Sequence, residues 1–472
     1  MITSWLLGIT ILLISMPCEL RSQSLPDFAK ARDEAVERLR ALVRIDTSNP
    51  PGNETKVAEY LKAILDKEGI ASEILEAVPG RGSLVARIKG NGSKKPLLLM
   101  GHEDVVGVER DKWTVDPFAA TIKDGYLYGR GASDDKDDVS AMLQVLLMLH
   151  RQKLPLDRDI IFLAEAGEEG GPPVGIDFLI EKHWPKIESE IALNEGGTIH
   201  LRDGKVQYVG IQTGEKIPRG LKLVAHGISG HGSVPRMDNP VYHLAAAIQK
   251  VAEYLPPMRL NETTRVFFER LAKISPPEEQ YIFTHLEDPA VGLELQEKLR
   301  RSTNRSYLSY NSMLRTSISP NIIQGGFRVN VVPAEAEATL DVRALPDEDM
   351  ERFAAELRRL INDPAVEVVQ NNWTTSRAAI PSRLDSVLFR ALEKAQTTVF
   401  PDAVTLPSMS TGATDSSQLR AKGVQAFGIG AVAADEDSER VHGNDERLSI
   451  EGYGKFLEFI YRAVVDVAAS RQ

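Results

Sequence analysis

The first half of the chain alternates between short apolar runs and stretches in which apolar residues recur at helical spacing. Apolar runs of this length, bounded by turn residues, are typical of buried strands. We expect strands at residues 83–89, 97–100, 159–164 and 190–193, and helices at 27–43, 55–67 and 139–150. This alternation predicts an α/β fold in which helices cover both faces of a sheet.

The pattern changes between residues 218 and 377, where alternating strands replace the apolar runs. Strands are expected at 221–225, 326–332 and 336–342, and helices at 241–254 and 347–360. This pattern indicates an inserted α+β domain, and we assign no chemistry to its charged, helix-rich middle at 257–316. A helix at 384–396 and a strand at 424–429 then predict a return to the first domain, so that residues 23–217 and 378–472 form one domain.

The N-terminal residues form a separate hydrophobic segment. Its apolar run, Trp5 to Met16, has the length of a secretory signal core and is short for a membrane span. We therefore expect residues 1–22 to be a signal peptide and the protein to be exported, periplasmic or secreted; an uncleaved membrane anchor is the alternative. The single cysteine, Cys18, lies in this segment, so the cleaved chain has no disulfide.

The composition describes a large acidic globular protein. With 472 residues, of which 42% are hydrophobic and 26% charged, the chain is long enough for two domains with substantial cores. Its formal net charge is −11, and no basic cluster interleaved with aromatic residues occurs along it. These two features argue against nucleic-acid binding.

Metal-type side chains follow the strand predicted at 97–100 and precede the helix predicted at 139–150. His102 and Asp104 come after the strand at 97–100, at the edge where open α/β sheets usually bind ligands. A histidine there can bind a metal while a nearby carboxylate fixes its tautomer. A glycine-punctuated turn then presents Asp134, which can bridge two cations. Taken singly, a turn histidine and a solvated acidic helix start explain the same residues.

Three further parts of the sequence also carry side chains of the kinds that bind metals. The pair Glu168 and Glu169 follows the strand at 159–164, Glu195 follows the strand at 190–193, and His442 comes late in the chain. Paired carboxylates at a strand end can provide one metal ligand and one general base. Each piece alone is also compatible with an exposed loop or a structural histidine.

Five motifs occur together along the chain. They are HxDVV from His102, W-x3-PF-x3-I-x-DG-x-LYGRGA-x-DDK from Trp113 to Lys136, EE-x-G from Glu168, NEGG from Asn194 and VHG-x-x-E from Val441. Together they resemble the M20 family of metallopeptidases, most closely its carboxypeptidase S-like and dipeptidase branch. The resemblance implies an α/β/α catalytic domain of the zinc-peptidase type with an inserted α+β lid and dimerisation domain at residues 218–377.

The resemblance also implies two zinc ions that share one carboxylate, although the same ligands would accept Co²⁺ or Mn²⁺. The five implied ligands are Asp134 as the bridge, His102 and Glu195 for one ion, and Glu169 and His442 for the other. Glu168 would act as general base for a hydroxide that bridges the metals, and Asp104 would orient His102. In the family the peptide bond that corresponds to Asp134–Asp135 is cis.

Four residues of the chain are similar to the family's substrate-binding residues. His231 would reach the active site of a partner subunit and stabilise the oxyanion, which implies a homodimer formed through the inserted domain. Asn330 and Arg343 would hold polar groups of the substrate, and the planar fork of Arg343 suits a terminal carboxylate. Gly412 would allow a close backbone approach. Without the resemblance, a structural histidine and a surface arginine would be the simpler interpretations.

The predicted function is that of an exported dizinc metallopeptidase, which hydrolyses amide bonds of short peptides or dipeptides next to a free C-terminal carboxylate. One alternative is an N-acyl-amino-acid amidohydrolase with the same metal centre, and another is a noncatalytic metal-dependent binding protein. Two residues depart from the family pattern: Gly107 stands at a usual proline, and Asp137 at a usual glycine. Neither departure removes a ligand, but Asp137 adds negative charge near the bridge.

Overall fold

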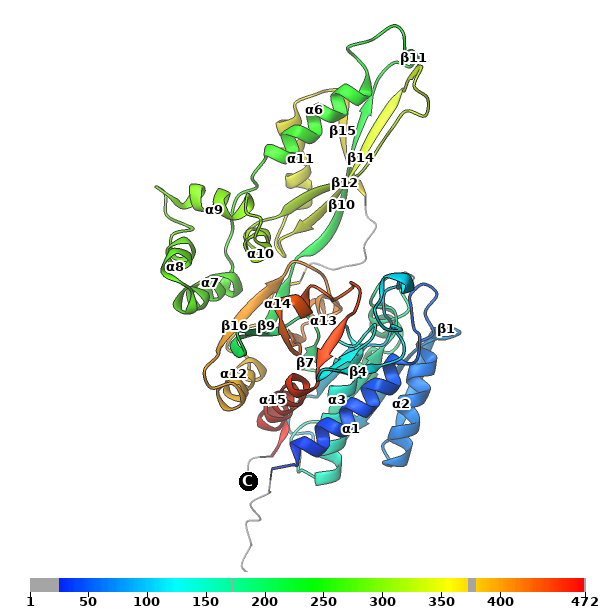
Figure 1. Ribbon diagram of the computed structural model, residues 1–472, viewed down its shortest axis with the longest axis vertical. Helices are drawn as coiled ribbons and strands as arrows, with labels where there is room; N and C mark the ends of the chain where they lie inside the picture. The colour runs from blue at the N-terminus through cyan, green and yellow to red at the C-terminus, as the bar shows by residue number, and fades with distance from the viewer. Residues whose placement is uncertain (1–24, 172, 372–378, 471–472) are drawn as a thin grey trace, which may run out of the picture.

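The computed structural model describes residues 25–171, 173–371 and 379–470 (Figure 1). The predicted signal peptide, residues 1–22, lies outside these ranges, and export therefore stays a prediction. Within the described ranges, no helix has the length and hydrophobicity needed to cross a membrane.

A ten-stranded mixed sheet forms the centre of the larger part of the molecule. Its strand order is β1-β2-β6-β3-β7-β17-β9-β8-β18, and β16 pairs with β9. The strands are β1 (Ser72–Val78), β2 (Arg81–Ile88), β3 (Leu97–His102), β6 (Ile160–Glu165), β7 (Ile191–Asn194), β8 (Thr198–Arg202), β9 (Lys205–Glu215), β16 (Val404–Ser410), β17 (Gln425–Gly428) and β18 (Val432–Ala434). Because β6, β3 and β7 run parallel, their carboxyl ends lie along one edge of the sheet.

Helices cover both faces of this sheet, which confirms the predicted α/β fold. Successive side chains of a strand point to opposite faces. Leu97 and Leu99 of β3 therefore join one core, and Leu98 and Met100 join another. The first core contains α1 (Phe28–Val43), α2 (Thr55–Lys67), α3 (Lys136–Gln152), α12 (Val387–Val399) and α15 (Ile450–Ala468), and the second contains α4 (Ile176–Lys182), α5 (Trp184–Ile187) and α13 (Ser416–Ala421).

A separate four-stranded antiparallel sheet extends away from the central sheet (Figure 1). Its strand order is β12-β14-β10-β15. The strands are β10 (Ile217–His226), β12 (Ser317–Gly325), β14 (Glu335–Ala344) and β15 (Val366–Asn371), and they pack against α6 (Pro240–Glu253) and α11 (Met350–Ile361). The short strands β11 (Gly230–His231) and β13 (Val331–Val332) pair at the end of this sheet that is farthest from β7.

The strand predicted at residues 326–332 is wrong. The strand of this region is β12, which ends at Gly325, and the chain turns before β13 begins at Val331. Gly326 has a φ of 75°, a backbone conformation that glycine adopts readily and that interrupts a strand. The alternation of apolar and polar residues after Gly326 therefore marks a turn and only two residues of strand.

The segment at 257–316 packs on the central sheet. It contains α7 (Glu262–Ile274), α8 (Pro277–Thr284), α9 (Gly292–Arg300) and α10 (Arg305–Met313). Phe267 and Phe268 of α7 share one core with Leu406 and Met409 of β16. The remaining elements are η1 (Arg110–Lys112), α14 (Asp435–Ser438) and a three-stranded sheet of β4 (Thr121–Lys123), β5 (Tyr126–Tyr128) and β19 (Arg447–Ser449).

Candidate metal centre

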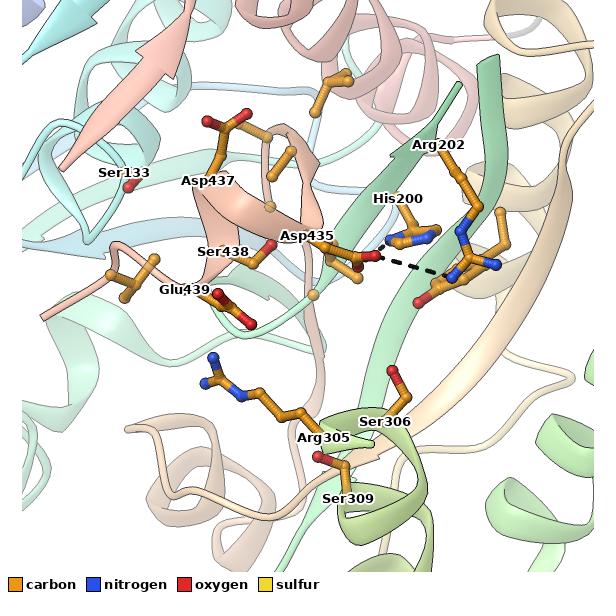
Figure 2. Close-up of a pocket in the computed structure, with 18 of the residues that line it drawn as sticks. Ser133, His200, Arg202, Arg305, Ser306, Ser309, Asp435, Asp437, Ser438 and Glu439 are labelled. Atoms are coloured by element: carbon orange, nitrogen blue, oxygen red, sulfur yellow. Dashed lines mark ion pairs between the residues drawn. The ribbon is translucent and has the colours of Figure 1, made fainter. Parts of the chain in front are cut away.

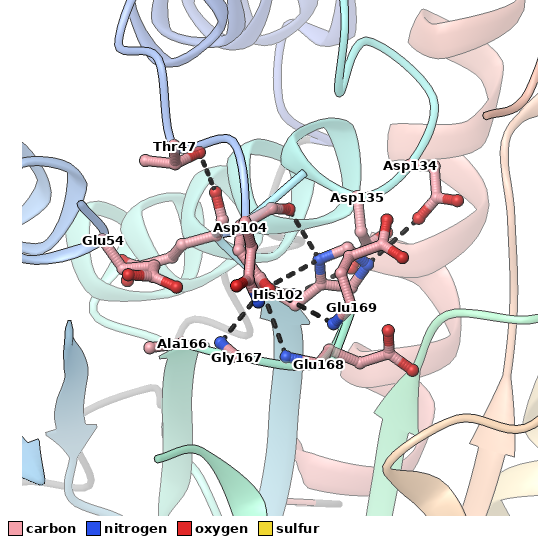
Figure 3. A network of polar contacts seen from close by, with 12 residues as sticks. Thr47, Glu54, His102, Asp104, Asp134, Asp135, Ala166, Gly167, Glu168 and Glu169 are labelled. Carbon is pink, nitrogen blue, oxygen red and sulfur yellow. Dashed lines mark hydrogen bonds and ion pairs between the residues drawn. The ribbon is translucent and has the colours of Figure 1, made fainter. Parts of the chain in front are cut away.

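Five side chains with metal-binding groups meet at the carboxyl edge of the central sheet. Each comes from a segment near a strand end or a helix start: His102 ends β3, Glu169 and Glu195 follow β6 and β7, Asp134 precedes α3, and His442 lies between α14 and β19. Figure 3 shows His102, Asp134 and Glu169 close together at this edge. The structure thus brings together the five residues that the family resemblance implies as metal ligands.

Asp134 lies between the two histidines. Its Oδ1 is 3.0 Å from Nε2 of His102, and its Oδ2 is 3.0 Å from Nε2 of His442. Nε2 of His442 is also 3.0 Å from Oε1 of Glu169. The ligand atoms form two groups: one of His102, Asp134 and Glu195, and one of Asp134, Glu169 and His442. Within each group, all the ligand atoms lie within 4.8 Å of one another. Because both groups use Asp134, its carboxylate is placed as a bridge between two cation sites.

The carboxylates of the centre favour a positive charge between them. Hydrogen bonds to Asp134 and Glu169 raise the pKa of His442 to about 10. Burial, followed by the charge of Asp134, raises the pKa of Glu195 to about 8. Both shifts are expected where negative groups are crowded and little positive charge offsets them. A pair of divalent cations would supply that charge, and the histidine and carboxylate donors fit zinc, cobalt and manganese.

Asp104 anchors the loop that carries Glu168 and Glu169. Its Oδ1 accepts hydrogen bonds from the backbone N–H groups of Gly167 at 3.0 Å and Glu168 at 3.1 Å, and its Oδ2 accepts one from Glu169 at 3.2 Å. Oδ2 also accepts a hydrogen bond from Nδ2 of Asn49 at 2.8 Å. Burial alone would raise the pKa of Asp104, but the hydrogen bonds and the neighbouring imidazole lower it below its usual range.

The orientation of His102 comes from the backbone more than from a carboxylate. Its Nδ1 is 2.9 Å from the carbonyl oxygen of Asp104 and 3.6 Å from the carboxylate Oδ1 of the same residue. An Nδ1–H that donates to this carbonyl leaves Nε2 free for a metal. The backbone N–H of His102 donates to Oδ2 of Asp135 at 3.0 Å. The Asp134–Asp135 peptide bond is cis, as the family resemblance implies.

The residues that hold His442 near Asp134 were not among the predicted site residues. Arg130 donates hydrogen bonds to the carboxylate of Glu446 and, at 2.8 Å, to the carbonyl of Gly443. Oε1 of Glu446 accepts a hydrogen bond at 2.9 Å from the backbone N–H of Ser133. This buried bridge ties the loop of His442 to the turn of Asp134. Their importance could have been inferred from the sequence, because Arg130 and Glu446 both belong to the motifs that resemble the M20 family.

The environment of Glu168 suits a proton acceptor. Glu168 is half-buried at the edge of the centre. Burial, followed by the charge of Glu195, raises the pKa of Glu168 well above its usual range. A carboxylate with a raised pKa is a stronger base near neutral pH. This agrees with the role that the sequence predicts for Glu168.

The two departures from the family pattern lie outside the ligand set. Gly107 is exposed, and nothing lies within 4 Å of where a Cβ would be. Asp137 is buried, and burial followed by the charge of Glu446 raises its pKa well above its usual range. Its neutral form is therefore favoured, which reduces the negative charge that it was expected to add.

The residues predicted to bind substrate are spread over the second sheet and one loop. His231 and Asn330 lie in and beside the β11–β13 pair, remote from β7 of the same subunit (Figure 1). Arg343 lies on β14, where its Nε is 2.9 Å from Oδ1 of Asp341. Gly412 follows β16, and its N–H donates to Oγ of Ser410 at 3.0 Å. Within one subunit, the structure thus does not bring His231 and Asn330 to the metal ligands.

A cavity of about 960 Å³ adjoins the centre, with Ser133 and His442 in its wall. Residues of β8, β18 and α14 form one side of it, and the N-terminal half of α10 forms another (Figure 2). The segment at 257–316, to which the sequence analysis assigned no chemistry, therefore contributes a wall of the cavity beside the ligands.

The sequence matches known metallopeptidases over most of its length. The model of the peptidase family M20/M25/M40 matches residues 98–466. The chain is 31% identical to "Probable carboxypeptidase S-like 2" of Dictyostelium discoideum over 81% of this chain and 74% of that protein. It is 28% identical to human "N-fatty-acyl-amino acid synthase/hydrolase PM20D1" over 94% of this chain and 90% of that protein.

Solved structures with the same fold include metallopeptidases. An M20 family metallo-carboxypeptidase of Sulfolobus solfataricus has a TM-score of 0.65 at 21% identity, covering 92% of this chain and 99% of that one. Human carnosine dipeptidase 1 has a TM-score of 0.63 at 18% identity, covering 93% and 97%. A Bacillus subtilis protein described as a dinuclear metal-binding M20 peptidase has a TM-score of 0.60 at 14% identity, covering 93% and 99%. With its sequence match, its fold and two ligand groups that share a carboxylate, the chain belongs to the M20/M25/M40 family of peptidases.

Proposed function

We propose that the protein is a dizinc peptidase that hydrolyses the amide bond next to the free C-terminal carboxylate of short peptides or dipeptides. The observation that carries this proposal is the carboxylate of Asp134, which two ligand groups share beside Glu168. The relatives named as a carboxypeptidase and a dipeptidase support the substrate class.

The side chains around the centre have different roles in hydrolysis. His102, Glu195, Glu169, His442 and the bridging Asp134 would hold two zinc ions, which lower the pKa of water and polarise a carbonyl group. Glu168 accepts the proton of the attacking water and delivers it to the nitrogen of the leaving amine. Asp104 holds the backbone of Glu168 by the hydrogen bond at 3.1 Å, so the base stays beside the ligands.

An N-acyl-amino-acid amidohydrolase is the second candidate. It is favoured by the human relative named as an N-fatty-acyl-amino acid synthase/hydrolase. Both candidates release an amino acid with a free carboxylate, and they differ in the acyl arm. The cavity beside His442 is lined by several charged and hydroxyl side chains, among them Arg202, Arg305 and Ser306. Such a lining is costly to desolvate for a long alkyl chain and suits a peptide.

A noncatalytic binding protein would not need the base or all five ligands. Here the ligands converge, and Glu168 lies beside them with a raised pKa. We therefore favour catalysis.

Removal of the metals is expected to abolish hydrolysis of a dipeptide such as Ala-Ala, and added zinc should restore it.

Amidating the C-terminus of the dipeptide should lower kcat/KM roughly 10- to 100-fold, because a charged hydrogen-bond partner is lost. The measurement is kcat/KM for the acid, the amide and N-acetyl-alanine with the zinc-loaded protein. Hydrolysis by the metal-free protein would exclude the metal mechanism, and equal rates for acid and amide would exclude recognition of the carboxylate.

We also propose a homodimer formed through the second sheet, with His231 acting across the interface. The edge strand β12 carries the exposed side chains Ile322 and Ile323, and Phe327 and Val329 follow it in the turn. An unpaired edge with exposed apolar residues readily pairs with another chain. The same turn lies beside His231, because the N–H of Gly232 donates to the carbonyl of Asn330 at 2.8 Å.

Mixing a His231→Ala protein with a Glu168→Gln protein is expected to recover activity. In a mixed dimer, one site has an intact Glu168 and receives an intact His231 from its partner. An equal mixture should reach about a quarter of the wild-type rate, because half of the dimers are mixed and each has one working site. Sedimentation and mass spectrometry verify the mixed dimer. If it forms without recovery of activity, His231 does not act across the interface.

A further inference from the structure

The wall that α10 provides for the cavity is fixed to the rest of the molecule. Tyr310 of α10 packs against Phe267 and Phe268, which share a core with β16. Near the C-terminal end of the helix, Nζ of the buried Lys216 donates hydrogen bonds to the carbonyl of Ser312 at 2.8 Å and, just beyond the helix, to that of Arg315 at 2.6 Å. The residues at the start of α10 therefore have a defined place opposite α14 and beside His442.

Most charges in the cavity are paired with one another. Nη2 of Arg202 is 3.8 Å from Oδ2 of Asp435, and Nε of Arg447 is 2.6 Å from Oδ1 of Asp437. Two lining residues are exceptions: the side chains of Arg305 and Glu439 form no hydrogen bond or ion pair with any residue in the described ranges. One free cation and one free anion therefore remain in an otherwise neutralised cavity.

Arg305 and Glu439 belong to opposite walls. Arg305 is the first residue of α10, and Glu439 directly follows α14, three positions before His442. In Figure 2 the Arg305 side chain extends from α10 toward the side of the cavity on which Glu439 lies. The two side chains are not joined to each other, so a group with both charges can be bound between them.

The size of the cavity indicates which part of the substrate it holds. Its volume of about 960 Å³ is near the upper end of the range of about 300–1,000 Å³ for small-molecule sites, far more than one small leaving amino acid needs. The leaving amino acid is assigned to Arg343 and Gly412, neither of which lines the cavity. The acyl arm of the amide is then the part that extends past His442 into this space.

We propose that this cavity binds the acyl arm of the cleaved amide, and that Arg305 and Glu439 recognise a carboxylate and an ammonium group on that arm. This proposal rests on the proposed peptidase function and specifies its substrate. The preferred substrates are short peptides that begin with glutamate or aspartate, because such a residue carries both charges on the acyl side. A guanidinium binds a carboxylate with two parallel hydrogen bonds, and a carboxylate accepts from an ammonium group.

The test compares three substrates that differ by one charge each. Glu-Ala carries both charges on its acyl arm, Gln-Ala lacks the carboxylate, and N-acetyl-Glu-Ala lacks the ammonium group. The zinc-loaded wild type, Arg305→Met and Glu439→Gln proteins are assayed for kcat/KM. Arg301→Met is the matched control, because Arg301 is an exposed arginine at the end of α9 that pairs with Glu297 and does not line the cavity.

The wild type should prefer Glu-Ala to both analogues. Arg305→Met should reduce the preference for Glu-Ala over Gln-Ala by about tenfold, and Glu439→Gln should reduce the preference over N-acetyl-Glu-Ala by a similar factor. Arg301→Met should leave both preferences within about twofold. Preferences that are unchanged in both cavity variants, or an equal loss for all three substrates, would overturn the assignment.

A binding measurement separates this proposal from the peptidase function. Glu-Ala and Gln-Ala are titrated by calorimetry into the zinc-loaded Glu168→Gln protein, with and without Arg305→Met. A Kd for Glu-Ala that rises about tenfold with Arg305→Met, while that for Gln-Ala does not, supports the site even if the wild type hydrolyses neither peptide. That combination would refute only the peptidase function. A Kd for Glu-Ala that Arg305→Met leaves unchanged would overturn the site, whatever the rate of hydrolysis.

Discussion

Replacing Glu168 with glutamine is expected to lower kcat by about 10²–10⁴-fold while both metal ions stay bound. Glutamine keeps the size of the side chain but cannot accept the proton of the attacking water. Glu168 is not a member of either ligand group, so the ligand atoms remain in place. Its backbone N–H still donates to Asp104, because this hydrogen bond does not involve the side chain.

The measurement combines kcat on a dipeptide with metal content by elemental analysis. Glu181→Gln is a suitable control, because Glu181 is an exposed glutamate on α4 that pairs with Lys182. The Glu168→Gln variant should bind about as much zinc as the wild type, but it lacks the base with the raised pKa. A Glu168→Gln enzyme with unimpaired turnover would refute the role of Glu168, and one that has lost its zinc would show instead that this side chain maintains the centre.

The meeting of three ligands at one edge of the sheet could be predicted from the pattern because parallel strands bring their carboxyl ends together, but their role as ligands was implied by the family resemblance. His102, Glu169 and Glu195 each end or follow a strand, and β3, β6 and β7 are short buried apolar runs that the sequence identifies well. The shared role of Asp134 required the family resemblance, since a local acidic turn before a helix has a capping explanation of its own.

The position of His442 beside Asp134 could not be predicted from the pattern of apolar and polar residues. It depends on Arg130 and Glu446, which are more than three hundred positions apart and form a buried ion pair. Periodicity describes which face of an element is buried, but it does not identify the partner across such a distance. The same limit applies to α10, whose exposed polar face is typical of a solvated helix. Its place in the cavity wall depends on the packing of Tyr310 against Phe267 and Phe268 of α7, which share a core with β16.

Replacing Asp134 with asparagine is expected to disrupt both metal sites, in contrast to Glu168→Gln. The two ligand groups share this carboxylate and no other. Asparagine retains one acceptor oxygen, so it can satisfy one ion, but it removes the negative charge and the second oxygen that face the other. Since changes in residues that only support the ligands typically cost about 10–100-fold in metal affinity, loss of a shared ligand should cost at least as much.

The expected result is weaker binding at both sites and a fall from two bound zinc ions per chain to fewer than one after dialysis, with a loss of activity that excess zinc reverses only in part. Asp111→Asn, at an exposed aspartate in η1, is the control for the loss of one negative charge. If the ions were bound independently, Asp134→Asn would empty one site and leave the affinity of the other unchanged. A zinc titration that retained two sites of wild-type affinity would refute the bridge. Weakening of both sites together would instead show that the carboxylate lying 3.0 Å from each histidine couples the two halves of the centre.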